Sequence, residues 1–279
     1  MISGILLLNK PSGISSNQAL QKAKKILKAS KAGHFGTLDP LAEGLLIIGI
    51  NSGTKLSKFL LNDCKEYEAT IRLGISTDTD DSEGRVIAAD DTQISIETLL
   101  GALDQFRGEQ TQIPPKYSAI KIQGRKLYDY ARKGQEIDIQ SRKVTIHFLE
   151  VLEFEYPNLK IKLKVSKGTY IRSIARDLGC KLGVGAHLTK LVRTGQGDFD
   201  LVNATTLENL DEQKILDLDK VFSETSCIEI SSSQLKDLEH GRRPSFNNSN
   251  KGLVILKHAN KIAGLARIDN GELIKEFLV

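Results

Sequence analysis

The chain has 279 residues, 40% of them hydrophobic and 27% charged, and a net charge of +4. These values exclude wholesale disorder and fibrous repeats, and the length allows one large domain and a small one. The longest apolar stretches, residues 2–8 and 45–50, are much shorter than the ~20 residues of a membrane span, and no signal peptide is recognisable. We therefore expect a cytoplasmic protein with no membrane-spanning segment.

Charged residues are unevenly distributed near the N-terminus. Residues 1–38 contain six lysines and no Asp or Glu, so that Asp39 is the first acidic residue. The mild net charge gives little support by itself for a polyanionic partner, but a single carboxylate after a basic segment is a candidate functional group. The three cysteines, Cys64, Cys180 and Cys227, are far apart and lack a C-x-x-C pair, which indicates reduced thiols and neither a disulfide framework nor a zinc site.

The N-terminal segment predicts a strand, a turn and a helix. Residues 5–8 are a short apolar strand, and residues 10–13 are a turn by composition. Ser15 and Gln18 form a capping-box pattern, after which apolar residues recur at helical spacing. The expected inward stripe comprises Ala19, Leu20, Ala23, Ile26 and Leu27. The opposite face carries three lysines, which either stay in solvent or contact phosphates.

Further elements follow between residues 66 and 108. Residues 66–75 alternate between polar and apolar side chains, which predicts a half-buried strand with Tyr67 on its inner face. Residues 78–84 are rich in Asp but do not fit a calcium loop, so we expect an exposed acidic loop. An amphipathic helix, ended by Gly108, is predicted next. Its apolar positions are Ile96, Leu99, Leu100, Leu103 and Phe106.

The segment 114–142 combines cations with aromatic residues. It contains Lys116, Lys121, Arg125, Lys126, Arg132, Lys133 and Arg142, with Tyr117, Tyr128 and Tyr130 among them. Interleaved cations and rings suit a groove that contacts an RNA backbone and stacks bases. Residues 159–165 then predict a strand with one apolar face and one lysine-rich face, and a helix with apolar positions from Ile171 to Leu182 follows.

The pattern changes after about residue 222 to short strands and polar turns. Strands at 253–256, 262–268 and 273–278, with a short helix near 232–240, predict a compact β domain. We therefore expect a domain boundary near residue 222.

Residues 33–44 hold the strongest candidate for chemistry. Three glycines and Pro40 surround Asp39; glycine permits positive φ, and a following proline drives Asp39 toward an extended conformation. Such a loop has a specially shaped backbone that aims one carboxylate. The alternative is a surface turn in which Asp39 caps a helix. His34 and the basic segment before it favour the functional interpretation.

The sequence Gly-His-Phe-Gly-Thr-Leu-Asp-Pro-Leu-Ala-Glu-Gly at 33–44 resembles the catalytic motif of the TruB family of tRNA pseudouridine synthases. Five further segments agree with that family in order along the chain. They are 7–13 (Leu-Leu-Asn-Lys-Pro-Ser-Gly), 65–67 (Lys-Glu-Tyr), 115–121 (Pro-Lys-Tyr-Ser-Ala-Ile-Lys), 167–172 (Lys-Gly-Thr-Tyr-Ile-Arg), and 185–188 (Gly-Ala-His-Leu) with Leu191 and Arg193. The similarity covers residues 2–200 and, more loosely, the remainder.

This resemblance implies an α+β pseudouridine synthase fold with a mixed, largely antiparallel sheet flanked by helices. It implies a catalytic domain at 1–222 with an RNA-contacting insertion at about 114–143, and a small, mostly β PUA-like RNA-binding domain at 223–279. The implied reaction is isomerisation of uridine to pseudouridine in the T-loop of tRNA (position 55), with flipping of the target base and without a metal or other cofactor. The expected partner is the T stem-loop, and nothing in the sequence requires more than a monomer.

The resemblance also implies roles for individual residues. Asp39 is the essential carboxylate, acting as nucleophile or as base, and Arg172 keeps it ionised. The flipped nucleotide is contacted by His34, Tyr67, Tyr170, Arg172 and Leu191. Structural support for the catalytic loop comes from Lys10 and Pro11. Contacts to the RNA come from Lys116, Tyr117, Lys121, Arg125 and Lys126.

Two other functions compete with this one. A non-catalytic RNA-binding protein or tRNA chaperone needs the basic surfaces but not Asp39. A glycoside hydrolase that uses Asp39 and Glu43 needs two carboxylates on opposite sides of one bond, which a pair four residues apart on one short segment fits poorly.

Overall fold

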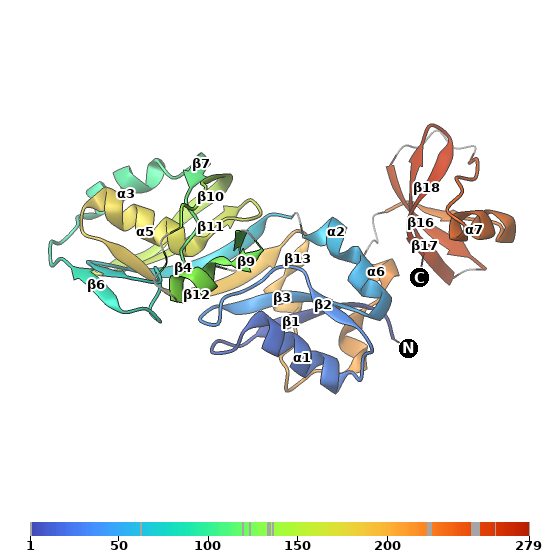
Figure 1. Ribbon diagram of the computed structural model, residues 1–279, viewed down its shortest axis with the longest axis horizontal. Helices are drawn as coiled ribbons and strands as arrows, with labels where there is room; N and C mark the ends of the chain where they lie inside the picture. Colours follow the sequence, from blue (N-terminus) through green and yellow to red (C-terminus); the bar gives the residue numbers. More distant parts are fainter. Residues whose placement is uncertain are drawn as a thin grey trace.

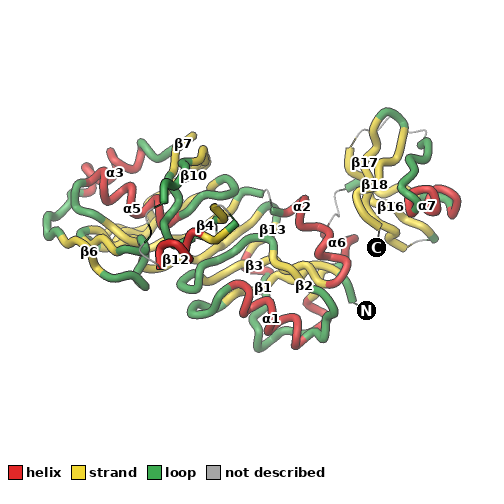
Figure 2. The backbone as a smooth tube through the Cα atoms, viewed as in Figure 1, coloured by secondary structure: helices red, strands yellow, loops and turns green. Residues whose placement is uncertain are grey.

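The computed structural model describes residues 2–61, 63–118, 120–122, 124–132, 135, 137–221, 225–246, 252–259 and 261–278. A large sheet covered by helices and a separate, smaller C-terminal sheet form the molecule (Figure 1). The tube view shows the strands of the large sheet running through its middle, with helices and loops outside (Figure 2). No helix in the described part of the chain has the length and apolar character needed to cross a bilayer.

The large sheet has ten strands, in the order β14-β1-β3-β12-β4-β11-β10-β7, with β2 beside β3 and β13 beside β12. The strands are β1 (Gly4–Lys10), β2 (Ala32–His34), β3 (Glu43–Ile50), β4 (Lys65–Leu73), β7 (Gly108–Gln112), β10 (Arg142–Glu155), β11 (Asn158–Val165), β12 (Ala186–Gln196), β13 (Phe199–Asp200) and β14 (Ile215–Leu216). The described pairings are antiparallel except that β12 runs parallel to β3, where Val192 and Arg193 lie opposite Glu43 and Gly44. The mixed, largely antiparallel sheet predicted from the sequence is therefore confirmed.

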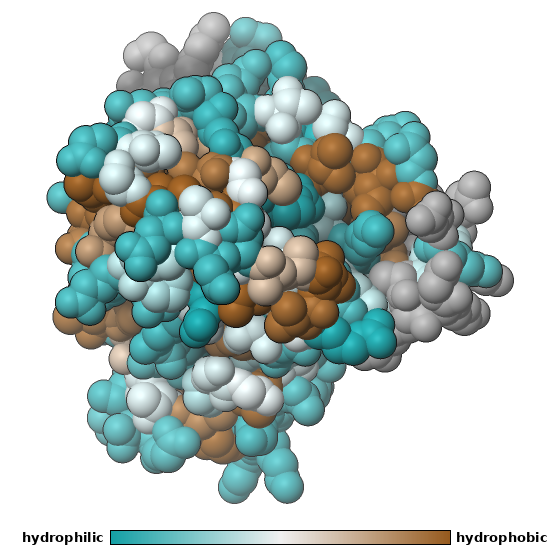
Figure 3. All heavy atoms as spheres, turned by 90° about the vertical axis from the view of Figure 1, so that its left-hand side faces the viewer, coloured by the Kyte–Doolittle hydropathy of each residue, from teal (hydrophilic) through white to brown (hydrophobic). Residues whose placement is uncertain are grey.

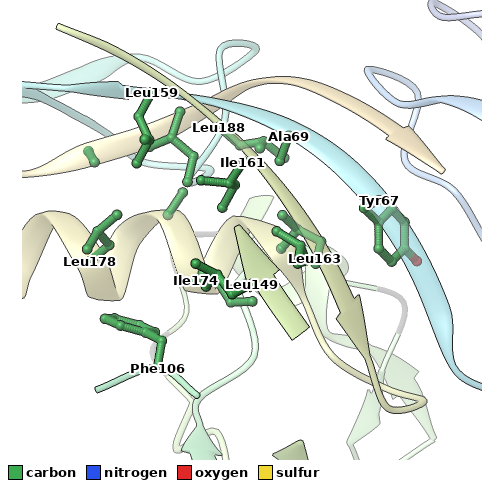
Figure 4. Close-up of a cluster of buried hydrophobic side chains, with 14 of the residues drawn as sticks. Tyr67, Ala69, Phe106, Leu149, Leu159, Ile161, Leu163, Ile174, Leu178 and Leu188 are labelled. Carbon is green, nitrogen blue, oxygen red and sulfur yellow. The ribbon is translucent and has the colours of Figure 1, made fainter. Parts of the chain in front are cut away.

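One half of the sheet encloses the largest hydrophobic core. The inner residues of β4, including Tyr67, Ala69 and Ile71, are buried as their alternation predicts. They pack with β11 and with the apolar face of helix α5 (Ile171–Leu182), from which Ile174 and Leu178 point toward the sheet (Figure 4). Tyr67 lies at the margin of this cluster. The core thus continues to the place where the candidate site residues lie.

Helix α1 (Ser16–Ile26) covers the other half of the sheet. The predicted capping box is confirmed, since the Ser15 side chain accepts from the Gln18 amide and the Gln18 side chain accepts from the Ser15 amide. Ala19, Leu20 and Ala23 are buried, but Ile26 is 45% exposed, so the predicted stripe is wrong at that position. Position 26 lies at the helix end, beyond the strands that α1 covers.

Helix α3 (Ile96–Asp104) also presents a narrower apolar face than the sequence predicts. Leu99 and Leu103 are buried against the core, whereas Ile96 and Leu100 are exposed. The helix ends at Asp104, four residues before Gly108, which is the first residue of β7. Only one edge of α3 meets α5 and the sheet, so the outer apolar residues stay in solvent.

Short elements complete the larger body. They are η1 (Asn51–Leu56), α2 (Ser57–Leu60), β5 (Ile75–Thr77), β6 (Val86–Ala89), β8 (Lys121–Ile122), β9 (Arg125–Lys126), α4 (Leu127–Arg132), η2 (Leu201–Asn203), η3 (Glu212–Lys214) and α6 (Leu218–Val221). Figure 3 views the end that carries α3 and β6 and shows hydrophobic patches among hydrophilic surface. The exposed apolar side chains of these two elements are Val86, Ile87, Ile96 and Leu100.

The C-terminal sheet has four strands and one helix. These are β15 (Cys227–Glu229), α7 (Ser232–Glu239), β16 (Gly252–His258), β17 (Lys261–Asp269) and β18 (Glu272–Leu278). Leu265 and Phe277 join a hydrophobic cluster that includes Leu56 and Leu60 of the larger body, and Lys58 pairs with Glu276 beside it. A C-terminal β domain is thus present, while the expected boundary at residue 222 lies outside the described residues.

Candidate active site

A cavity of about 290 Å³ opens at the centre of the large sheet. Five segments that are far apart in the sequence contribute to its lining: the loop before β3, strand β4, the insertion, the turn before α5, and strand β12. The lining residues are Gly36, Thr37, Leu38, Asp39, Leu61, Lys65, Tyr67, Ser118, Lys167, Gly168, Thr169, Tyr170, Ile171, Leu191 and Arg193. Asp39, Tyr67, Tyr170 and Leu191, which the sequence analysis selected, therefore meet around one space.

The loop that carries Asp39 is held by side chains that bind its backbone. Arg193, 1% exposed, donates from Nε to the Leu45 carbonyl at 2.7 Å and from Nη2 to the Gly36 carbonyl at 3.1 Å. The hydroxyl of Ser16 both accepts from the Leu38 amide at 2.7 Å and donates to the Leu38 carbonyl at 2.9 Å. These bonds fix the residue directly before Asp39.

Gly44 is required where this loop enters β3. Its φ is +102°, and a Cβ at this position would lie 2.4 Å from the Arg193 carbonyl oxygen. Any larger residue would push β3 away from β12, because the contact is with backbone. The glycine that the motif contains thus allows the parallel contact that joins the two halves of the sheet.

A second support lies under Pro40. Lys10, fully buried, donates from Nζ to the carbonyls of Pro11 and Ile14 at 2.8 and 2.7 Å. The Gly13 amide then donates to the Pro40 carbonyl at 2.8 Å. Burial lowers the pKa of Lys10 to about 8, against the attraction of Asp39 and Glu43. The turn that begins at Lys10 is therefore bonded to the residue after Asp39.

Asp39 pairs with Arg172, the second residue of α5. Arg172 Nη2 lies 2.9 Å from Asp39 Oδ2, and the arginine side chain is 5% exposed while that of Asp39 is 34% exposed. Arg172 Nη1 lies 3.2 Å from Asp81 Oδ2, and Nη2 also donates to the Tyr117 carbonyl at 3.0 Å. One planar guanidinium thus joins two carboxylates and the start of the insertion.

Asp81 is a residue of the site that no sequence pattern indicated. Residues 78–84 were expected to form an exposed acidic loop, but Asp81 is 3% exposed and its side chain accepts from the Thr79 hydroxyl. The loop folds back on α5 because Arg172 and Arg176 bind Asp81 and Asp80. The alternate spacing of Thr77, Thr79 and Asp81 could have indicated that this loop folds on itself and is not extended into solvent. In the structure, Thr77 Oγ1 donates to the Asp81 carbonyl at 2.7 Å.

Burial and two neighbouring charged groups, Arg172 and Asp81, shift the pKa of Asp39. Burial raises the pKa of Asp39 above the usual value of an aspartate, Arg172 opposes that rise, and Asp81 adds to it by repulsion. The expectation that Arg172 favours the ionised carboxylate agrees with the direction of its effect. Burial and Asp81 act against it, so Asp39 is a stronger base than an aspartate on the surface.

Aromatic and apolar side chains form the walls. Tyr67, 7% exposed, lies opposite Arg193 in the β4–β12 pairing, and Leu191, 6% exposed, lies two residues along β12. The backbone of Tyr170 is held by Gln112, which accepts from its amide at 2.8 Å and donates to its carbonyl at 3.1 Å. The Arg142 guanidinium lies over the Tyr170 ring, 5.3 Å from its centre. Flat rings and a leucine suit a planar, uncharged ligand.

Two lysines, Lys65 and Lys167, are among the residues that line the cavity. Lys65 is 8% exposed and donates to the carbonyls of Leu61 and Asp63 at 3.2 and 2.7 Å. Burial and the nearby Arg193 lower its pKa to about 8. Together with Lys167, it places positive charge where an anionic backbone would approach.

Other residues selected from the sequence lie elsewhere. His34 is not among the described residues that line this cavity; burial lowers the pKa of its imidazole, and its Nδ1 has no hydrogen-bond partner within the described ranges. Lys116 and Tyr117 line a neighbouring cavity of about 860 Å³ between the insertion and the acidic loop. The side chains of Lys121, Arg125 and Lys126 lie outside the described residues.

Comparison with protein families identifies the family of the chain. Residues 24–171 match the model of the TruB family pseudouridylate synthase N-terminal domain, and residues 172–228 match that of the tRNA pseudouridylate synthase B C-terminal domain. The chain belongs to the TruB family of pseudouridylate synthases. The first match contains Asp39 and both tyrosines, and the second begins at Arg172, so the Asp39–Arg172 pair joins the two matched regions.

Full-length relatives agree with the family assignment. The chain is 41% identical to the tRNA pseudouridine synthase B of Azoarcus sp., over all of this chain and 95% of the relative. It is 42% identical to the same enzyme of Francisella philomiragia, over 99% of this chain and 94% of the relative. The chain is accordingly a pseudouridine synthase.

Solved structures support the fold. A Cbf5-Nop10-Gar1 complex contains a chain with a TM-score of 0.71 and 24% identity, covering 99% of this chain and 84% of that one. An H/ACA RNP bound to a substrate RNA containing 2'-deoxyuridine contains a chain with a TM-score of 0.70 and 22% identity, with the same coverage. The predicted pseudouridine synthase fold is thereby confirmed.

Proposed function

We propose that this protein converts the T-loop uridine of tRNA, at position 55, to pseudouridine, with Asp39 as the essential carboxylate. The observation that carries the proposal is the ion pair between buried Arg172 and partly exposed Asp39, at the wall of a cavity that two tyrosines and Leu191 also line. The family and the names of its relatives give the reaction class and the tRNA substrate. The position of the uridine and the role of each residue are our inference.

The reaction rearranges bonds without changing composition. The C1′–N1 bond breaks, the base turns, and a C1′–C5 bond forms, while the hydrogen leaves C5 and N1 gains one. An ionised carboxylate serves either as nucleophile at C1′ or as base for a sugar proton. Asp39 is fit for either role because Arg172 favours its charged form while burial keeps it basic.

The nucleotide must leave its stack to reach this cavity. Flipping exposes both faces of the base, and the ring of Tyr67 or Tyr170 can stack on one of them. Leu191 lies beside Tyr67 on the adjacent strand and supplies apolar contact. His34 lies before the catalytic loop, and we propose that it contacts the RNA beside the extruded nucleotide and not the base itself.

Binding of the rest of the RNA involves the insertion and the C-terminal sheet. We assign phosphate and sugar contacts to Lys116, Tyr117, Lys121, Arg125 and Lys126, and the C-terminal sheet to a PUA-like RNA-binding domain beginning near residue 223. Such contacts give an affinity that falls with salt. The roles of Lys10 and Pro11 are to hold the turn that bonds to Pro40. A monomer acting in the cytoplasm, where tRNA is present, completes the proposal.

Asp39→Asn tests the central claim. We expect pseudouridine formation to fall about 10³-fold or more because the amide can neither attack nor accept a proton, while tRNA binding stays within about 3-fold. The readouts are nucleotide-resolution mapping of pseudouridine and a filter-binding titration with unmodified tRNA. An active Asp39→Asn protein would remove Asp39 from the mechanism, and a native protein that binds tRNA without modifying it would support the non-catalytic alternative.

Glu43→Gln is the matched control. The Glu43 carboxylate pairs with Lys190 Nζ at 3.2 Å, and Glu43 is not among the described residues that line the cavity. We therefore expect near-native activity. Equal loss in the two variants, together with release of free sugar, would instead favour the glycoside hydrolase.

A further inference from the structure

Ser118 places a buried hydroxyl in the wall of the cavity. The residue is 5% exposed, it lines the same space as Asp39 and Tyr67, and its Oγ has no hydrogen-bond partner among the described residues. Buried polar groups in folded proteins are almost always hydrogen-bonded, so an unpaired one needs an explanation. A hydroxyl in a cavity wall becomes paired when a polar ligand fills the cavity.

Two hydrogen bonds hold the backbone at Tyr117 and Ser118. Before it, the Tyr117 carbonyl accepts from Arg172 Nη2 at 3.0 Å, and the same nitrogen lies 2.9 Å from Asp39 Oδ2. At Ser118 itself, the carbonyl accepts from the Tyr128 amide at 3.2 Å. The position of the hydroxyl is therefore linked to that of the reacting carboxylate through a single guanidinium group.

Two other polar groups of the cavity wall already have partners in the protein. The Thr169 hydroxyl donates to the Ser166 carbonyl at 2.9 Å, and the Lys65 ammonium binds two backbone carbonyls. Ser118 differs from these two because its hydroxyl has no hydrogen-bond partner among the described residues.

We propose that the Ser118 hydroxyl donates a hydrogen bond to one carbonyl oxygen of the extruded uracil before the base turns and to the other carbonyl oxygen afterwards. The proposal rests on the proposed function, in which Asp39 faces the ribose of that nucleotide. The aromatic walls of the cavity stack on the faces of the base, so polar contacts must be made to its edge. Uracil presents two carbonyl oxygens along that edge, on either side of N3.

The symmetry of the rearrangement explains why one hydroxyl is enough. Moving the attachment from N1 to C5 requires a half-turn of the base about the line through N3 and C6. That half-turn exchanges the places of the C2 and C4 carbonyl groups. A donor fixed in the protein beside one carbonyl in the substrate therefore faces the other carbonyl in the product.

Ser118→Ala in the full-length protein tests the contact. With a synthetic T stem-loop RNA at saturating enzyme, we expect the single-turnover rate of pseudouridine formation to fall about 10-fold and the Kd to stay within about 2-fold. Ser118→Thr retains the hydroxyl and should recover most of the rate, which a purely structural role for the side chain would not predict. A native rate in Ser118→Ala, or a change in Kd alone, would overturn the proposal.

Ser52→Ala is the matched control, because Ser52 Oγ is also buried without a partner among the described residues, and Ser52 is not one of those that line the cavity. We expect a native rate from it. If the native protein and this control form no pseudouridine, the proposed function fails. If both are active and Ser118→Ala equals them, only the contact is wrong.

Target nucleotides with 2-thiouridine or 4-thiouridine test the half-turn, since sulfur is a weak acceptor in place of either carbonyl oxygen. Each substitution should slow the native protein by a larger factor than it slows Ser118→Ala. A larger factor for both supports a bond to one carbonyl before the rotation and to the other after it. A larger factor for one alone, or for neither, overturns that claim.

Discussion

The loop that carries Asp39 and the insertion both border the carboxylate that we propose to be catalytic, but they are held in different ways. The loop is bonded through its backbone to Arg193, Ser16 and the turn at Lys10, all of which lie under it. The insertion reaches the same place through Tyr117 and Ser118, and the Tyr117 carbonyl accepts from Arg172, which also binds Asp39. Asp39 thus lies on a loop that several bonds to its backbone hold in place, and we call these bonds the foundation of the site. The insertion, in contrast, is joined to Asp39 through the arginine that both contact.

The strongest test of this comparison is Arg172→Lys, which affects both regions. A lysine is a single point charge and cannot bind Asp39, Asp81 and the Tyr117 carbonyl from one plane. We expect kcat to fall about 10²- to 10³-fold with a small change in tRNA affinity, measured by single-turnover kinetics. Arg176→Lys, one turn further along α5 and paired with Asp80, should stay within about 3-fold of native activity. Equal losses in both would mean that the helix, and not the shared guanidinium, matters.

Gly44→Ala tests the foundation alone. The φ of Gly44 is +102°, and the added methyl group would lie 2.4 Å from the Arg193 carbonyl oxygen. We therefore expect the free energy of unfolding to fall by about 3 kcal/mol or more, with loss of activity. The measurement is chemical denaturation. Gly183→Ala has a similar positive φ of +79° with open space around the site, and should cost only about 1 kcal/mol. Similar costs would show that backbone strain, and not the strand contact, explains the glycine.

Asp81→Asn separates electrostatics from position. We expect the rate to fall as the pH falls through the pKa of Asp39, because the protonated carboxyl is inactive. Burial raises that pKa, and the negative charge of Asp81 raises it further. Removing the Asp81 charge lowers the pKa of Asp39, so the acid limb of the kcat–pH profile should move to lower pH. Asp78→Asn, which breaks an ion pair with exposed Arg85, should leave the limb in place. An acid limb that moves upward in Asp81→Asn would contradict this account.

The smallest effect is expected in the insertion. Lys116 is exposed, so Lys116→Ala should weaken tRNA binding about 3-fold, reduce the salt slope by about 1, and leave the unfolding free energy unchanged. Binding titrations at several salt concentrations measure it. A destabilised protein would show that the insertion is part of the foundation.

The sequence predicted the parts of the site that depend on local chemistry. Glycine and proline spacing indicated the loop around Asp39, and alternation indicated the inner face of β4. Helical periodicity predicted too wide a buried face, because Ile26 and Leu100 lie where neither sheet nor helix covers them. The burial of Asp81 depends on arginines almost one hundred residues later, which no local pattern reveals. The role of Arg193 as a clamp on the loop likewise depends on the pairing of β12 with β3.

Strand β12 positions two residues of the site. Leu191 and Arg193 are two positions apart, so they project from the same face, one toward the cavity and the other under the loop before β3. A slip of this strand by one residue would turn both away at once. The register of one strand therefore sets both the apolar wall of the cavity and the arginine that binds the loop before Asp39.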